Sequence, residues 1–456
     1  MPTVGLSMIV KNGAETLRPC LESVRGIVSQ TVIADTGSTD ASCDIARDFG
    51  ASVISIPWEN HFANARNAAL APMTTDWVVV LDADEELDRD AKKMLPDLLS
   101  VPHVGGYLVP IRNYMPNNFT RGWDRVGVAN DHRNERAKDA PSYVVHENCR
   151  LFRRDPRVYF AGRLHELVEN QILATGLELR VARFCIHHFG QMVDMEARAR
   201  KHVFYRDLLR TKLEEHPRDH QGWTQLGLHE FECFNNPDEA MRCFEKALTL
   251  QPEFPEAWLF KGMVYLNQGR CEEALAAIEH DRRKDVGGAL REELKADAML
   301  SLRRFKEARM AYRRAMKLTP ENAMLESKLG YTEVHLGQVN SGLAKLRRAA
   351  RMARDHHVMY DRLLKACIIA GRLPEAAEAA EKLATLVPNP RTFLRAASIR
   401  AQLKQWDLAQ EILSRGLQRF PDSAELQRAA TEAGNYASRH TADGEGRSQD
   451  TQLSSV

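Results

Sequence analysis

Two carboxylates stand at the end of an apolar run near residue 80. Asp82 and Asp84 follow the run WVVVL at residues 77–81, and one residue separates them. A short apolar run bounded by polar residues predicts a strand that is covered on both faces of a parallel sheet. Ligands of open α/β sheets bind at the carboxyl ends of strands, and carboxylate oxygens suit hard cations that also hold phosphate oxygens. The pair therefore predicts a metal-assisted site for a diphosphate-bearing ligand.

The residues before this pair predict the sheet that positions it. Strand-like runs cover residues 4–10, 31–34 and 51–56, and each is followed by a turn and a segment with polar and helical character. Strands that alternate with helical segments predict a parallel, doubly wound sheet with helices on both faces. The unusual polar residues then fall at the carboxyl ends of its strands: Lys11, Asp35, Arg66, Asp82 and Asp84.

Neither common phosphate-binding loop occurs in the chain. No G-x-G-x-x-G follows the first strand, and no G-x-x-x-x-G-K-[ST] is found anywhere. A bound cation together with the planar donor fork of Arg66 provides another way to balance a diphosphate. We therefore expect a divalent metal, Mn²⁺ or Mg²⁺, as the cofactor.

Four motifs in order, LSMIVKN, ADTGSTD, FANARNAAL and VVLDADEE, resemble the nucleotide-binding half of inverting, GT-A-fold glycosyltransferases of the family 2 type. The resemblance covers roughly residues 4–190. It implies that Asp35 binds the nucleotide base, that Asp84 binds the metal, and that Asp82 lies toward the ribose or joins the metal. Arg66 and Lys11 are the implied donor contacts. Asp35 has an alternative role as a turn-former that caps the next helix, and Arg66 as a helix residue paired with an acid.

The segment after the acidic pair must supply the catalytic base. Residues 150–166 contain R-L-F-R, a short turn, an aromatic-glycine pair and His165-Glu166, which resembles the corresponding segment of bacterial family members that modify glycans or peptides. An inverting transfer needs one carboxylate to accept the acceptor's proton. We predict Glu166 as this base, with Asp155 and Glu147 as competitors; the other possibility for Glu166 is a salt-bridged structural acid.

Two histidines compete for the place of a further metal ligand. His165 precedes the predicted base, and His188 follows the apolar segment 181–186. No Cys pair has zinc-finger spacing, and the His-Glu pair lacks the second His of a zinc-protease helix. A structural zinc site is therefore not expected from the sequence.

A long polar stretch lies in the second half of this predicted domain. Residues 115–142 have no periodic apolar face and include Arg121, Trp123 and the run 131–133, Asp-His-Arg. A loop of this length within a compact domain is commonly functional or disordered. We predict that it forms a mobile flap near the acceptor.

Beyond about residue 195 the chain becomes repetitive. Small residues recur with a spacing of 34, 34, 34, 34 and 33 at Ala240, Ala274, Ala308, Gly342, Ala376 and Ala409. With Trp223, Leu226 and Gly227 before the first of them, this period resembles the tetratricopeptide (TPR) pattern of helix-turn-helix repeats, in which a small residue allows two helices to approach closely. Stacked repeats form a superhelix that commonly binds a peptide or a protein, although such an array also braces or dimerises enzymes.

Composition sets further limits. A net charge of +1 on 456 residues argues against a nucleic-acid or anionic-membrane partner. No secretory signal pattern or apolar run of 18 residues is seen, so we expect a cytoplasmic protein without a transmembrane segment. The 8 Cys are scattered, as for reduced thiols.

The predicted organisation is an α/β GT-A (nucleotide-diphospho-sugar transferase) domain followed by an all-α TPR superhelix. The predicted boundaries are 1–195 for the transferase domain, 196–217 for a linking helix, 218–430 for about six repeats, and 431–456 for a disordered tail. The resemblance implies a metal-dependent hexosyltransferase that uses a nucleotide sugar, such as a UDP-sugar, on a peptide, protein or glycan acceptor. The attacking atom is left open among oxygen, sulfur and nitrogen. The alternative is a non-catalytic TPR scaffold whose first domain senses nucleotide sugars.

Overall fold

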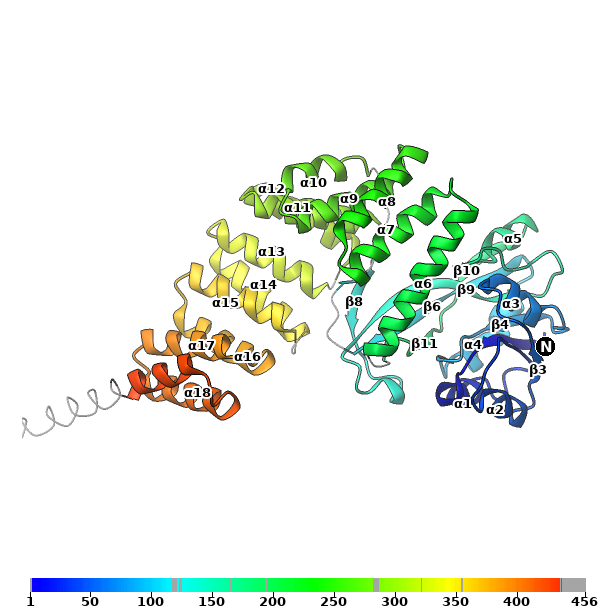
Figure 1. Ribbon diagram of the computed structural model, residues 1–456, viewed down its shortest axis with the longest axis horizontal. Helices are drawn as coiled ribbons and strands as arrows, with labels where there is room; N and C mark the ends of the chain where they lie inside the picture. The colour runs from blue at the N-terminus through cyan, green and yellow to red at the C-terminus, as the bar shows by residue number, and fades with distance from the viewer. Residues whose placement is uncertain are drawn as a thin grey trace, which may run out of the picture. The chain divides into compact units, whose positions relative to one another are not determined.

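A computed structural model describes residues 2–116, 121–122, 125–164, 166–192, 195–281, 287–320, 322–353, 356–434 and 436. The chain forms two compact units, and the boundary between them lies between Val264 and Tyr265. The first unit contains the sheet and the first helices of the array, and the second contains the remaining helices (Figure 1).

The first unit is built on one large mixed sheet. Its strands are β1 (Val4–Val10), β2 (Gln30–Asp35), β3 (Ser52–Ser55), β4 (Trp77–Val80), β5 (Glu85–Leu87), β6 (Val104–Met115), β7 (Arg121–Gly122), β8 (Arg125–Ala129), β9 (Ser142–Arg153), β10 (Glu178–Val181) and β11 (Ile186–His188). Its helices are α1 (Ala14–Ser23), α2 (Ser42–Asp48), α3 (Phe62–Leu70), α4 (Ala91–Leu99), the short 3-10 helix η1 (Glu135–Ala137) and α5 (Glu169–Ala174).

The strand order is β3-β2-β1-β4-β9-β6-β11-β5. The pairs β1–β2, β2–β3 and β1–β4 are parallel, as the sequence predicted. The doubly wound pattern stops after β4, because β9 runs antiparallel to both β4 and β6. The two 12-residue strands β6 and β9 form the centre of the second half of the sheet. The sheet is thus parallel on one side and mixed on the other.

Strand β4 is buried on both faces, as its uniformly apolar sequence predicted. Trp77 and Val79 belong to a core shared with α1, α2 and α4, whereas Val78 and Val80 belong to a second core shared with α3 and α5. Because successive side chains of a strand point to opposite faces, this one strand anchors both helical layers. Its carboxyl end is therefore held firmly where the acidic pair begins.

The polar stretch 115–142 is more regular than the sequence suggested. It contains β7, β8 and η1, and β8 pairs antiparallel with β9 through Gly127 and Val144. The expectation of a stretch without regular structure was wrong, because short strands that extend an existing ladder need little apolar periodicity of their own. Trp123 lies outside the described residues. The predicted flap motion stays a prediction.

A long helix, α6 (Met195–Glu215), follows the last strand, close to the predicted linking helix 196–217. Leu208, Leu209 and Leu213 of α6 pack in one cluster with Leu164 and with Leu226. Because Leu164 belongs to the sheet part and Leu226 to the next helix, α6 packs on both. The compact first unit consequently extends past residue 195 and includes the helices up to Val264.

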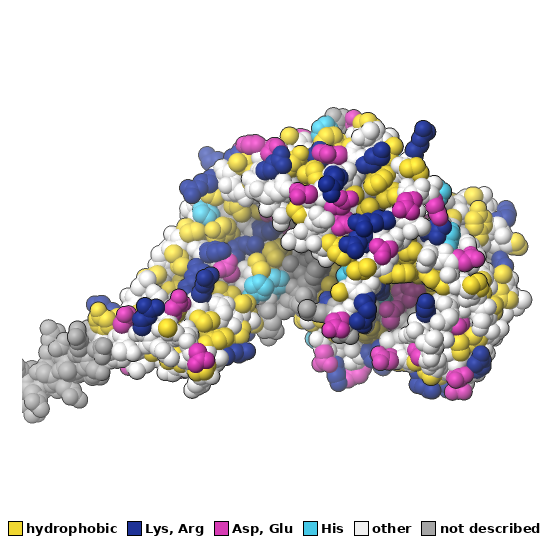
Figure 2. Space-filling model, viewed as in Figure 1, with side chains coloured by type: hydrophobic (Ala, Val, Ile, Leu, Met, Phe, Trp, Pro, Cys, Tyr) yellow, Lys and Arg dark blue, Asp and Glu magenta, His cyan; other side chains and the backbone are white. Residues whose placement is uncertain are grey.

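Helices then follow in pairs through the described part of the array. They are α7 (His220–Phe234) with α8 (Pro237–Leu250), α9 (Pro255–Asn267) with α10 (Cys271–Ile278), α11 (Gly287–Ser301) with α12 (Phe305–Leu318), α13 (Ala323–His335) with α14 (Val339–Met352), α15 (His357–Ile369) with α16 (Leu373–Leu386), and α17 (Pro390–Gln402) with α18 (Trp406–Arg419). Residues 424–434 are also helical, so the helical part continues beyond the predicted start of the tail at 431. Residues 437–456, where the tail was predicted, lie outside the described residues. On the visible face of the molecule, acidic and basic side chains are intermixed (Figure 2).

All six residues of the 34-residue period are buried and lie on the second helix of their pairs. At Gly342 the reason is visible, since an added Cβ would lie 2.5 Å from the carbonyl oxygen of Gly330 and 2.9 Å from the backbone nitrogen of Val334. Helices α13 and α14 therefore touch through their backbones at this point. The predicted close approach within a repeat is confirmed here.

Replacing Gly342 by Ala should destabilise the repeats. A clash with backbone atoms cannot be relieved by a side-chain rotation, and overpacking typically costs about 1–3 kcal/mol, which exceeds the roughly 1 kcal/mol that Ala gains over Gly within a helix. We expect the urea midpoint, followed by circular dichroism, to fall. The control is Gly434→Ala, where the nearest atom to an added Cβ is a Gln410 side-chain nitrogen at 3.3 Å. A higher midpoint for Gly342→Ala than for the wild type would contradict this packing.

Candidate functional site

The carboxyl ends of β1, β2 and β4 meet at one edge of the sheet. Asp35 ends β2 beside Val10 of β1, and Ser7 of β1 pairs with Val80 of β4. Asp35 is buried, and its carboxylate accepts the backbone N–H groups of Gly37 at 3.2 Å and Ser38 at 3.1 Å. It therefore shapes the turn after β2, and its contact with a nucleotide base stays a prediction. Lys11 is exposed directly after β1, at the same edge.

A network of buried charges lies beside this edge. Arg66 of α3 donates from Nη2 to Asp82 Oδ1 at 2.8 Å and from Nε to Glu166 Oε1 at 2.5 Å. Arg150 of β9 donates from Nη2 to Asp82 Oδ2 at 3.1 Å and to Glu85 Oε1 at 2.9 Å. The backbone N–H of Asp82 closes the network by donating to Glu85 Oε2 at 2.8 Å. Two arginines and three acids from four separate segments are thus tied together.

Burial and charge act in opposite directions on these groups. Burial raises the pKa of the Asp82 carboxyl, but Arg66 and Arg150 outweigh it and hold the pKa below its usual range. Burial also raises the pKa of Glu85, and there the attraction of Arg150 is too small to reverse the effect. The pKa of Arg66 is raised in spite of burial, because Asp82 and Glu166 surround it. Asp82 and Arg66 are therefore a firmly ionised pair.

This network engages Asp82 in a way that the sequence did not predict. Each of its carboxylate oxygens accepts from an arginine, and its role toward the ribose or the metal stays a prediction. The sequence could not show these contacts, because Arg66 and Arg150 are 16 and 68 residues away from Asp82. Arg66 keeps one donor available, since its buried Nη1 has no hydrogen-bond partner among the described residues. A buried guanidinium nitrogen without an acceptor is suited to an anionic oxygen.

Asp84 pairs with one of the predicted histidines instead. Its Oδ2 lies 3.4 Å from Nε2 of His188, while Nδ1 of His188 contacts Oδ1 of Asn113 at 2.6 Å. Burial raises the pKa of Asp84, and His188 more than offsets this, so the pKa of Asp84 is lowered. Burial lowers the pKa of His188, and Asp84 reverses this and raises it. The amide oxygen behind the ring and the carboxylate before it orient Nε2 toward Asp84.

The donor set and the space around this pair fit a divalent metal ion. A carboxylate oxygen and an imidazole nitrogen are common ligands of Mn²⁺ and related ions. Gly190 lies over both atoms, and a Cβ at this position would lie 2.5 Å from His188 Nε2 and 2.7 Å from Asp84 Oδ2. The glycine thus leaves the space above the two donor atoms clear of a side chain. His165, the competing ligand, lies outside the described residues.

The three candidate bases lie in different places. Glu166 contacts Arg66 and thereby joins the acidic edge. Glu147 is exposed on β9; because Val79 pairs with Leu151 in antiparallel strands, positions below 151 on β9 lead toward the carboxyl end of β4. Asp155 is misplaced for this role. Trp77 pairs with Arg153, and the backbone N–H of Arg154 donates to the backbone carbonyl oxygen of Asp76 at 2.9 Å. Asp155, the next residue, therefore lies at the amino end of β4.

At about 3.3 Å per residue, roughly 20 Å of chain separates that end of β4 from the acidic pair. Asp155 instead pairs with the exposed Arg157 at 2.7 Å. The prediction of Asp155 as a competing base was therefore wrong. The reversal of β9 relative to β4 is the physical reason, and the local sequence gives no sign of it.

Sequence reasoning missed Arg150, Glu85 and one aromatic side chain of α6. Burial raises the pKa of Tyr205 on α6, and Asp82, Glu166 and Asp84 add to the effect, which places its hydroxyl within electrostatic reach of all three acids. Tyr205 also stacks on Phe62 of α3, with ring centroids 6.4 Å apart. Helix α6 thus contributes to the same site. The R-x-F-R motif and the acids after Asp84 were visible signals for Arg150 and Glu85, whereas nothing in the sequence of α6 singled out Tyr205.

These features define an α/β domain with acidic side chains and a possible metal site at the carboxyl ends of its parallel strands, followed by helical repeats. The family profile "Glycosyl transferase family 2" matches residues 6–158, and "Tetratricopeptide repeat" matches residues 234–280. The sheet part of the chain thus matches a glycosyltransferase family 2 profile, and part of the helical array matches a tetratricopeptide profile.

Relatives of both kinds are found. A TPR repeat-containing protein of Synechococcus elongatus is 32% identical over 234 residues, which cover 50% of this chain and 52% of that protein. An uncharacterized glycosyltransferase of Rickettsia felis is 30% identical over 108 residues, covering 24% of this chain and 38% of that protein. The chain thus spans about half or less of the length of these relatives. The solved structure of the APC/C hetero-tetramer Cut9-Hcn1 has a TM-score of 0.41 at 15% identity, covering 58% of this chain and 51% of that one.

In the part of the chain that the structure describes, no helix is both long enough and apolar enough to cross a bilayer.

Loss of Arg150 should strongly destabilise the first unit. In Arg150→Met the carboxylate of Glu85, whose side chain is 1% exposed, loses its cationic partner, and removing one member of a buried ion pair typically costs about 3–5 kcal/mol. We expect a lower melting temperature by calorimetry. The matched control is Arg157→Met, which removes an exposed partner of Asp155 and should leave the melting temperature unchanged. Equal melting temperatures of the two variants would show that the buried network contributes little.

Proposed function

We propose that this protein is an inverting, metal-dependent glycosyltransferase that moves a sugar, such as a hexose, from a nucleotide-diphosphate donor to a peptide, protein or glycan acceptor. The donor proposed is a UDP-sugar. The observation that supports this most directly is the pairing of Asp84 with His188 at 3.4 Å, next to an arginine with an unpartnered buried nitrogen. A metal ligand pair and an anion-binding donor at one sheet edge suit a diphosphate.

Each group has a distinct role in this proposal. Asp84 and His188 would hold Mn²⁺ or Mg²⁺, which when bound neutralises the diphosphate oxygens and stabilises the departing nucleotide. Arg66 Nη1 would donate to a diphosphate oxygen, and Asp35 and Lys11 would contact the nucleoside part at the ends of β2 and β1. The burial of Arg66 strengthens its interaction with phosphate because little water competes there.

The transfer needs one proton acceptor. Glu166 would take the proton from the acceptor's O–H, N–H or S–H group while that atom forms a bond to the anomeric carbon. The bond from this carbon to the diphosphate oxygen breaks in the same step, and its electron pair leaves with the nucleoside diphosphate. Attack from the face opposite the diphosphate inverts the configuration. The contact with Arg66 fixes the direction in which the Glu166 carboxylate faces.

The repeats would bind the acceptor or a protein partner. Stacked helical repeats offer extended surfaces for peptides and proteins, and this use is the commonest one for such arrays. An oligomer formed through the repeats is the alternative use. Neither use requires nucleic acid.

Asp84→Asn should abolish metal-dependent donor binding and turnover. The amide keeps the size of the side chain but loses the charge that attracts a divalent cation. We expect thermal stabilisation by UDP-sugar with Mn²⁺ to disappear and sugar-donor hydrolysis to fall to background. The metal-free melting temperature should fall less than in Arg150→Met, because the side chain of Asp84 is 29% exposed whereas that of Glu85 is 1% exposed.

The matched control is Asp97→Asn, an exposed acid on α4. Retained metal-dependent binding in Asp84→Asn would contradict the metal assignment. A wild-type protein that binds nucleotide sugars with Mn²⁺ but neither hydrolyses nor transfers them would favour the non-catalytic sensor over the enzyme.

Glu166→Gln should slow transfer without loss of donor binding. The amide oxygen still accepts from Arg66 Nε but cannot take up a proton at neutral pH, so kcat should fall by about 10²–10⁴-fold. Donor affinity, measured by calorimetric titration, should change little. The comparison variant is Glu147→Gln, which alters the competing base on β9. A larger fall in kcat for Glu147→Gln than for Glu166→Gln would transfer the role of base to Glu147.

A further inference from the structure

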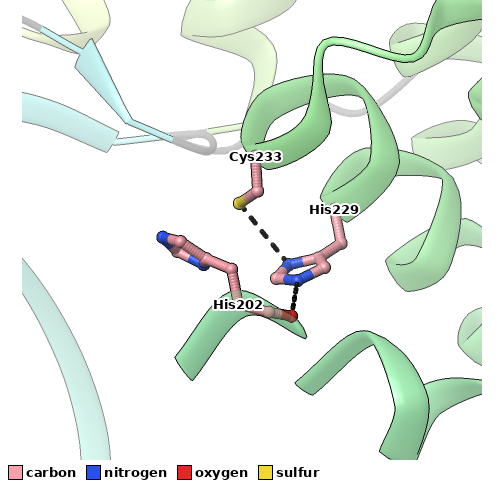
Figure 3. Close-up of side chains that lie close together, drawn as sticks. All are labelled: His202, His229 and Cys233. Carbon is pink, nitrogen blue, oxygen red and sulfur yellow. Dashed lines mark hydrogen bonds between the residues drawn. The ribbon is translucent and has the colours of Figure 1, made fainter. Parts of the chain in front are cut away.

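Three metal-ligand side chains meet where α6 packs against α7. His202 lies on α6, and His229 and Cys233 lie on α7 with a spacing of four residues, which places both on one face of that helix (Figure 3). Their ligand atoms all lie within 4.8 Å of one another, and all three residues are half-buried. None of them takes part in the site described above.

The geometry of the two α7 residues suits a tetrahedral metal. Cys233 Sγ lies 3.6 Å from His229 Nδ1. A tetrahedral ion with a metal–sulfur bond of about 2.3 Å and a metal–nitrogen bond of about 2.0–2.1 Å separates sulfur from nitrogen by about 3.5–3.6 Å. The observed separation therefore fits a shared zinc ion as well as the hydrogen bond between the two side chains.

The orientation of the His229 ring is fixed in the manner of a metal ligand. Its Nε2 lies 2.9 Å from the backbone oxygen of His202, and because a carbonyl oxygen only accepts, Nε2 carries the hydrogen. In the neutral ring Nδ1 then has a free electron pair, and it faces the sulfur of Cys233. Metal-bound histidines are characteristically held by such a bond from the second ring nitrogen to a carbonyl.

We propose that His202, His229 and Cys233 bind a zinc-type ion, with water as the fourth ligand. Two imidazoles and one thiolate favour Zn²⁺ and disfavour Mg²⁺ and Mn²⁺, which prefer oxygen ligands, so this site differs in chemistry from the Asp84–His188 pair. The His202 ring points away from the other two side chains in Figure 3. The ligand atoms lie within 4.8 Å of one another, so binding would need a rotation of the His202 side chain that brings its nitrogen closer by about 1–1.5 Å, to the separation expected for tetrahedral ligands.

The ion would fasten the helix that covers the glycosyltransferase site. Lys201 and Tyr205 of α6 lie on the side that faces the acidic edge. The charge of Lys201 helps to lower the pKa of Asp84, and the charge of Asp82 helps to raise the pKa of Tyr205. His202 is about 100° around the helix from Lys201 and faces α7. Arg210 and Glu230, 2.9 Å apart, join the same two helices further along. A metal at this point therefore fixes α6 between α7 and the site.

One other cluster of this kind exists in the described part of the chain, and its atoms are already engaged. His187 contacts the Tyr114 hydroxyl from Nδ1 at 2.8 Å and Asp88 from Nε2 at 3.2 Å, and Cys185 lies beside them. Because the Asp88 carboxylate accepts, the hydrogen of the neutral His187 ring lies on Nε2, so the ring nitrogen that faces Asp88 and Cys185 has no free electron pair for a shared ion. Cys185 accordingly provides a matched control for Cys233.

The test is a Co²⁺ titration of the full-length, reduced and metal-free protein. Cobalt bound to a thiolate gives a charge-transfer absorption that cobalt bound only to oxygen and nitrogen does not. We expect one equivalent of Co²⁺ to produce this band and one equivalent of Zn²⁺ to remove it. Cys233→Ser should abolish the band, His229→Gln and His202→Gln should weaken Co²⁺ binding by 10-fold or more, and Cys185→Ser should leave both unchanged.

Circular dichroism checks that each variant is folded. If Cys233→Ser does not fold, His202→Gln decides, since His202 is partly exposed and its loss leaves the thiol and the band's origin in place while the affinity falls. A wild-type protein without a thiolate band, a band that survives in folded Cys233→Ser, or a band lost in Cys185→Ser would overturn the proposal. If His202→Gln binds Co²⁺ as tightly as the wild type, His202 is not a ligand, and the proposal that the ion joins α6 to α7 is wrong.

Discussion

Arg66 and Arg150 carry their charge inside the domain, so acids must surround them, and this requirement organises the region around the acidic pair. A guanidinium group does not lose its proton in proteins, so burial must be offset by carboxylates. Asp82, Glu85 and Glu166 meet that need, with side-chain exposures of 32%, 1% and 11%. The segments that bear these groups are the end of β4, α3, β9 and the loop before α5. None of them can move independently without leaving a buried charge unpaired.

The same network separates the tasks of two neighbouring carboxylates. Asp82 is occupied by two arginines, and Asp84, two residues later, faces an imidazole. The two aspartates both follow β4 in the sequence, but their side chains have different partners. One acid keeps an arginine in place with a donor free for an anionic oxygen, and the other remains available to a cation. A cation at Asp84 and an anionic oxygen at Arg66 can then be bound side by side, as a metal-bound diphosphate requires.

Helix α6 connects this chemistry with the repeats. Its one side presents Tyr205 to the acids, and its other side packs against α7 through Leu209, Leu213 and the seam that contains His202. A displacement of α6 would alter the charge environment of Asp82 and expose apolar side chains of both parts. Coupling between the repeats and the acidic edge therefore has a physical route, namely the position of one rigid helix that contacts both.

Much of this organisation follows from local sequence. The parallel strands β1 to β4, the D-x-D position and the period of the repeats were predictable, because buried strands and close-packed helices impose short-range patterns of apolar and small residues. His188 was one of two histidines predicted as a further metal ligand, and its contact with Asp84 became visible only in the structure. The reversal of β9, which moves Asp155 to the far end of β4, was not predictable, since strand direction depends on pairing between distant segments. The ligands of the α6–α7 cluster likewise come from two helices, so no single spacing reveals them. Sequence alone thus determined the first four strands, the repeats and the place where acids follow a strand. Tertiary structure decided which acid meets an arginine and which meets a histidine, because only folding brings charges from positions 66, 150, 166 and 188 to one place.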